Sequence, residues 1–232
     1  MYQVHPSERL VSAYKKRPFQ GQHPKDAKVI FLGRDANYSS AISSHSFFKR
    51  IIEYHDNGVK FWETYGVHHP FLHDEHPYIK YKDDMFKDGV KYHKVFAKMC
   101  LNTQYAKYIS FVELLDVPTC GKTGEDTNNI FYKSIDPEYI ERLENWLLNT
   151  GDKIVFVPKM VIKDLKKVKQ KTKRFSWLLA ANGELPNDEP HCILNQGDVK
   201  FYKCSHFSGA ISNHHLCKIT NIIRAFVDNF IK

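Results

Sequence analysis

The sequence contains little cysteine and no long apolar run. Its five cysteines are scattered over 232 residues and form no Cys-x-x-Cys pair, so neither a disulfide framework nor a zinc knuckle is indicated. No stretch approaches the roughly 18 consecutive apolar residues of a membrane span, and residues 1–16 lack the apolar core of a signal peptide. We therefore expect reduced thiols, no membrane partner and an intracellular location, cytoplasmic or, in a eukaryotic cell, nuclear.

The common nucleotide-binding signatures are missing as well. No Gly-x-Gly-x-x-Gly occurs, which removes the dinucleotide fingerprint. Gly121-Lys122-Thr123 is similar to the end of a phosphate-binding P-loop, but the glycine required five residues earlier is replaced by Asp116. We expect no bound cofactor and no metal.

Positive charge is in excess. The chain has 34 Lys and Arg against 26 Asp and Glu, a formal net charge of +8, which favours a polyanionic partner such as nucleic acid. Much of the excess lies in residues 159–174, where a basic helix is predicted. Its lysines form either a solvated helix face or a surface that follows phosphates. The candidates for phosphate contact are Lys163, Lys166 and Lys167.

Predicted strands and helices alternate along the chain. Apolar runs predict four buried strands, and a shorter fifth is expected near residues 192–194; the runs are 29–33, 108–115, 153–157 and 199–204. Caps and apolar spacing predict helices at 7–16, 45–54, 85–100, 137–150, 159–170 and after Ser212. This order is typical of a three-layer α/β/α sandwich with a central, mainly parallel sheet of four or five strands. The length suits a single domain over residues 1–232, with its core at about 29–227.

Residues 59–83 look like an irregular insertion. They contain four histidines between positions 68 and 76, and two histidines three residues apart could share a metal on one helix face. Pro70 and Pro77 argue against a helix there, which favours a solvated loop over a metal site.

Two polar loops follow predicted strands at opposite ends of the chain. One offers Asp35 and the other His206. Because the ligand crevice of an open α/β sheet lies outside the carboxyl ends of its strands, the two side chains are expected in one site. A carboxylate and an imidazole there could activate water and stabilise developing charge. The alternative makes Asp35 a helix cap and His206 a packed loop residue.

Three segments together resemble the uracil-DNA glycosylase superfamily, and most nearly its mismatch-specific branch. Residues 29–40, VIFLGRDANYSS, are similar to its first motif, a strand followed by Gly-x-Asp/Asn-Pro. Residues 113–119, ELLDVPT, resemble the end of its second strand, and residues 206–212, HFSGAIS, resemble its third motif, His or Asn followed by Pro-Ser. The resemblance implies a monomeric base-excision repair enzyme that flips a damaged base out of single- or double-stranded DNA and hydrolyses its N-glycosidic bond.

The resemblance also implies roles for individual residues. Asp35 would orient water and stabilise a positively charged sugar, and His206 would support the departing base. The residues expected to bind the base are Gly33, Arg34, Asn37, Tyr38, Glu113 and one of Phe47 and Phe48, which would stack on it. The residues expected to hold DNA are Ser208, Gly209, Ser212 and Ile211, the last as a wedge in the base stack.

The sequence departs from the family pattern at three positions. The motif prolines are replaced by Ala36 and Phe207, and a base-reading Asn is replaced by Glu113. An ionised Glu only accepts hydrogen bonds, which puts uracil in doubt as the substrate if Glu113 faces the base; the alternative turns Glu113 away. These departures leave a second hypothesis open, a diverged, non-catalytic binder of nucleic acid or nucleotides with the same fold.

Overall fold

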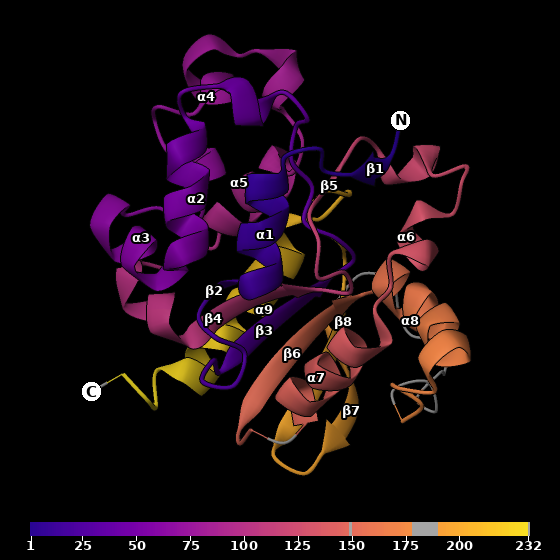
Figure 1. Cartoon of the computed structure of the whole chain (residues 1–232). Coiled ribbons are helices and arrows are strands. Elements are labelled where there is room, and N and C mark those ends of the chain that lie inside the picture. The colour runs from indigo at the N-terminus through magenta and orange to yellow at the C-terminus, as the bar shows by residue number, and fades with distance from the viewer. Residues whose placement is uncertain (149, 178–189, 232) are drawn as a thin grey trace.

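The computed structural model describes residues 1–148, 150–177 and 190–231. Its main element is a six-stranded sheet with the order β2-β4-β3-β6-β8-β7 (Figure 1). The bounds are β2 Phe19–Gly21, β3 Val29–Gly33, β4 Ile109–Glu113, β6 Lys153–Pro158, β7 His191–Gln196 and β8 Val199–Cys204. The four predicted strands are β4, β3, β6 and β8, which run parallel, while the edge strands β2 and β7 run antiparallel to their neighbours. The prediction of four or five strands was too low because β2 has only three residues.

The central strands are buried on both faces. All five residues of β3 are buried, as a continuous apolar run predicts. Its side chains alternate between two cores: Ile30 and Leu32 belong to one, and Val29 and Phe31 to the other. Helices must therefore cover both faces of the sheet.

Each face has its own set of helices. The core that contains Ile30 also contains apolar residues of α6 (Ile130–Lys133), α7 (Pro137–Leu148) and α8 (Lys159–Thr172). The core that contains Phe31 is closed by α3 (Gly58–Tyr65), α5 (Val90–Ala97) and α9 (Asn213–Val227). In Figure 1, α7 and α8 lie on the near side of the sheet and α9 passes behind it. The prediction of a mainly parallel sheet between helices is confirmed at this level.

A third apolar cluster joins the N-terminal helices to the segment after β3. It contains residues of α1 (Glu8–Lys16) and α2 (Phe48–Asp56), together with Tyr38 and Phe71. Ser7 caps α1 and Ser212 caps α9, as the sequence predicted.

Residues 59–83 are more regular than predicted. They include most of α3, a 3-10 helix Pro70–Leu72 and α4 (Pro77–Tyr81); further 3-10 helices are Ile42–Ser44, Asp84–Phe86, Thr103–Tyr108 and Thr123–Glu125. The prolines stand at the first helical positions, where their missing N–H costs nothing, and His69 and His76 cap the helices through their rings. The prediction of a solvated loop was wrong, because His68, His69, His73 and His76 are all buried.

A two-stranded ribbon closes the N-terminus onto this structure. In it β1 (Gln3–Val4) pairs antiparallel with β5 (Thr119–Cys120), which follows β4 along the chain. This pairing brings Tyr2 against the loop after β3. None of the helices in the described part of the chain is long and apolar enough to cross a membrane.

Candidate functional site

A pocket of about 570 Å³ opens at the carboxyl ends of the parallel strands. In chain order the four parallel strands are arranged second, first, third, fourth, so the connections diverge between β3 and β6. Such a switch point is where open α/β sheets bind ligands. Nine predicted site residues line the pocket: Gly33, Arg34, Asp35, Asn37, Tyr38, Glu113, His206, Ser208 and Gly209. The loops after β3 and β8 therefore meet, as predicted.

Asp35 is fixed by two hydroxyl donors. Tyr2 Oη donates to Asp35 Oδ2 at 2.9 Å, and Thr119 Oγ1 donates to the same oxygen. Burial raises the pKa of the carboxyl group above its ordinary value, while the two hydrogen bonds and Arg34 oppose that rise. Both hydrogen bonds are to Oδ2. In the described part of the chain no hydrogen bond is formed to Oδ1, so Oδ1 can interact with a bound molecule.

The loop that carries Asp35 is held to β5 by backbone hydrogen bonds. Thr119 N–H donates to the carbonyl oxygen of Ala36 at 2.8 Å, and Tyr38 N–H donates to that of Thr119 at 2.9 Å. The Asn37 side chain donates to the carbonyl oxygen of Gly121 at 2.8 Å. The carboxylate is thus held on rigid backbone, which suits a catalytic group.

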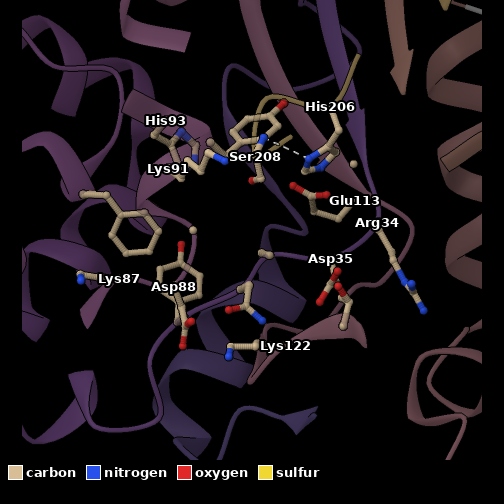
Figure 2. Close-up of a pocket in the computed structure, with 18 of the residues that line it drawn as sticks. Arg34, Asp35, Lys87, Asp88, Lys91, His93, Glu113, Lys122, His206 and Ser208 are labelled. Carbon is tan, nitrogen blue, oxygen red and sulfur yellow. Dashed lines mark hydrogen bonds between the residues drawn. The ribbon is translucent and has the colours of Figure 1, made fainter. Parts of the chain in front are cut away.

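Arg34 lines the pocket, but its guanidinium is turned toward α8. Its Nε lies 3.7 Å from Asp164 Oδ2 on α8, and its guanidinium lies over the Phe131 ring, 4.1 Å from the centroid. Figure 2 shows this side chain directed away from Glu113 and the rest of the pocket. Arg34 therefore ties the β3 loop to α8 rather than reaching a ligand.

Glu113 ends β4 and points into the pocket between Asp35 and His206 (Figure 2). Tyr139 Oη donates to its backbone carbonyl at 2.8 Å and fixes the strand end. Burial, with a smaller contribution from the neighbouring Asp35 charge, raises the pKa of the Glu113 carboxyl group to about 8. The protonated form of Glu113 therefore dominates at pH 7.

His206 is presented as a neutral ring. Ser208 N–H donates to its Nδ1 at 3.2 Å, which places the ring proton on Nε2. Burial lowers the pKa of the imidazole, so the neutral form dominates at pH 7. The Nε2–H group can therefore donate to an oxygen or nitrogen of a bound molecule.

The opposite wall of the pocket comes from the segment predicted to be irregular and from α5. His69, Phe71 and His93 line it. The His69 and His93 rings are stacked with centroids 3.6 Å apart, and His68 Nε2 lies 3.1 Å from His93 Nδ1. Burial lowers the pKa of each of these three histidines, so the wall is uncharged. Within the described residues no group of three or more His, Cys, Asp or Glu is arranged to hold a metal ion.

Three lysines stand at the mouth of the pocket. Lys87, Lys91 and Lys122 are exposed and line it, with Asp88 among them. No motif predicted Lys87 or Lys91, because solvated lysines are common on any surface. We call these three residues the rim lysines.

Several predicted site residues lie away from the pocket. Phe47 and Phe48 are buried in the cluster with α1, and Phe47 packs on His76 with centroids 5.1 Å apart, so neither can stack on a ligand as the structure stands. The apolar face of α2 turns them inward, and Phe71 is the phenylalanine that lines the pocket. Ile211 is half-buried against the α9 core, and Ser212 caps α9.

The predicted α8 lysines are also outside the pocket. Lys163, Lys166 and Lys167 are exposed, and Lys167 Nζ lies over the Tyr132 ring, 4.4 Å from its centroid. The α8 residues that line the pocket are instead Met160 and Val161.

Two residues that bind Asp35 were not predicted from the sequence. Tyr2 was missed, and Thr119 was given no role. Both bind Asp35, but Tyr2 is 33 positions away in the sequence and no local pattern marks it. Thr119 lies in a segment that suggested a site without showing which side chain points inward.

No protein-family model, curated protein or solved structure matches the chain. The function of the pocket has to be inferred from its own residues.

Proposed function

We propose that the protein is a DNA glycosylase that hydrolyses the N-glycosidic bond of a damaged base flipped into the pocket. The observation that carries this proposal is the placement of Asp35 and His206, from loops some 170 positions apart in sequence, on one pocket at the switch point of the sheet. A volume of about 570 Å³ is within the usual range for small-molecule sites and leaves room for a base and its sugar.

The chemistry divides between the two residues. As the bond from C1′ to the base nitrogen breaks, the base takes the bonding electrons and the sugar becomes positively charged. Asp35 stabilises this sugar and orients the water whose oxygen bonds to C1′, while the water proton passes to solvent or to the carboxylate. His206 donates from Nε2 to the departing base and spreads its negative charge. Neither group has to move, since both are fixed by backbone and hydroxyl contacts.

DNA would approach through the mouth of the pocket. A base has to leave the stack to reach a pocket of this depth, and phosphates on either side of it would lie near the rim lysines. Ser208 and Gly209 line the same pocket and are exposed. Their backbone N–H groups donate to His206, so the Ser208 hydroxyl is the group that can bind a phosphate there.

The alternative is a binder of nucleic acid or nucleotides that shares the fold without the reaction. Its support comes from Ala36 and Phe207, which replace the motif prolines and are both buried. Phe207 packs on Phe31 with centroids 5.6 Å apart, so the third loop is shaped by core packing rather than by a proline ring.

One assay separates the two functions. Labelled oligonucleotides that contain uracil, hypoxanthine, xanthine or a thymine mispair are incubated with the protein and then treated with alkali. Strand scission at the modified position of at least one oligonucleotide is expected. Tight binding with no alkali-labile site in any of them would favour the binder.

A further inference from the structure

Glu113 places its carboxyl group inside the pocket, where no group in the described part of the chain forms a hydrogen bond with it. In residues 1–148, 150–177 and 190–231 its side chain makes no hydrogen bond or ion pair, although its backbone carbonyl is held by Tyr139. Its carboxyl group lies directly over Gly33 and faces the pocket. A bound molecule is therefore what this group is placed to meet.

The surroundings disfavour an ionised Glu113. Asp35 is the charged neighbour that influences its pKa most, and that charge is negative. His206 is neutral, and the other titratable groups that interact with Glu113 are phenols from the helices and the β3 loop: Tyr14, Tyr38, Tyr54, Tyr92 and Tyr139. Burial in this setting gives the carboxyl group a pKa of about 8.

We propose that Glu113 binds the flipped base as a neutral carboxylic acid, donating through its O–H to one atom of the base edge and accepting through its C=O from the atom beside it. The inference rests on the proposed function, and it identifies the ligand as a base that presents one acceptor next to one N–H. The O4 and N3–H of uracil form such an edge, as do the O6 and N1–H of hypoxanthine. Glu113 is a specificity residue in this account and moves no proton during the reaction.

This inference revises the expectation that Glu113 excludes uracil. That expectation assumed an ionised carboxylate, which only accepts hydrogen bonds and would face O4 with no proton between them. A neutral acid offers the same acceptor and donor pair as the amide of Asn or Gln. Glu113→Gln should therefore preserve recognition of the base. The same substitution would abolish activity if Glu113 acted as a general acid or a general base.

The test measures binding alone, so that it does not depend on catalysis. The probes are two oligonucleotides, one with a 2′-fluoro uracil nucleotide that resists excision and one with an abasic analogue. Their dissociation constants are compared from pH 6.5 to pH 8.8, below the pH at which uracil loses its own N3 proton, for the wild type, Glu113→Gln and Glu113→Leu. For the wild type we expect at least a tenfold preference for the uracil probe at pH 6.5, which falls above pH 8. For Glu113→Gln the preference should persist at pH 8.8, and for Glu113→Leu it should be lost at every pH.

Two results would overturn the inference. One is a wild-type protein that binds both probes equally at pH 6.5, and the other is a Glu113→Gln variant as impaired as Glu113→Leu. Failure of the excision assay together with the expected binding pattern would contradict the glycosylase reaction and leave the role of Glu113 standing.

Discussion

The carboxyl group of Glu113 occupies the space over Gly33 where a β-carbon would otherwise lie. A β-carbon built at Gly33 would stand 1.9 Å from Glu113 Oε2 and 2.7 Å from Cδ. The two residues are register partners at the ends of the parallel strands β3 and β4. Glycine is needed here for room and not for its backbone freedom, and this pairing is what lets a carboxyl group point into the pocket.

Gly33→Ala should displace the Glu113 side chain. We expect a loss of stability of no more than about 1 kcal/mol, because the overlapping atoms are the end of a flexible side chain that can turn away, and at least a tenfold loss of the preference for the uracil probe over the abasic probe. Urea unfolding and probe binding measure the two effects. In a Glu113→Ala background the overlap is gone, so most of the stability cost of Gly33→Ala should vanish. An equal cost in both backgrounds would show that the contact does not matter.

The rim lysines should carry the salt dependence of DNA binding. Each phosphate contact contributes about 0.9 to the slope of log K against log salt for duplex DNA. Changing Lys87, Lys91 and Lys122 together to Gln should lower the slope by up to about 2.7, and a salt titration of the dissociation constant measures it. The matched control changes Lys163, Lys166 and Lys167 to Gln. A larger drop in the control would place the DNA along α8, as the sequence alone suggested.

The buried histidines should make the protein sensitive to acid. Burial lowers the pKa of His68 to about 3 in the folded chain, against about 6.5 when unfolded, so below pH 6.5 the unfolded state binds the extra proton. The wild type should therefore lose about 2 kcal/mol of unfolding free energy between pH 7 and pH 5 relative to His68→Phe. The comparison with the variant cancels the opposite contribution of Glu113, whose raised pKa favours the folded state as the pH falls.

Urea unfolding at the two pH values checks this expectation. His191→Gln, at an exposed position, is the control and should follow the wild type. A difference between wild type and His68→Phe that does not change with pH would mean that His68 is not held neutral in the fold.

Much of the sheet could be predicted because its central strands are buried on both faces. A short apolar run such as residues 29–33 predicts a buried strand. The four parallel strands, and the loops that carry Asp35 and His206, could therefore be predicted from the sequence pattern. The short strand β2 could not be predicted, because three residues show no period and its pairing with β4 is a tertiary contact.

The histidine-rich segment was misjudged for a different reason. His69 and His76 act as helix caps through their ring nitrogens, a role that Ser or Asp usually fills. Their neutral rings can then be buried, which composition cannot reveal. The prediction that Phe47 or Phe48 stacks on the base was wrong, because helix packing turns both side chains inward. The contact of Tyr2 with Asp35 could not be predicted, because it depends on the pairing of β1 with β5.

The most direct test of the account is single-turnover excision by Asp35→Asn on the best oligonucleotide substrate, with DNA affinity measured in parallel. The carboxylate acts on charge that exists only in the transition state, so the rate should fall about 10²–10⁴-fold while the dissociation constant changes less than threefold. Asp152→Asn, at an exposed position outside the pocket, should match the wild type in both measurements. An Asp35→Asn variant that excises the base at the wild-type rate would contradict the assignment of this pocket as a glycosylase site.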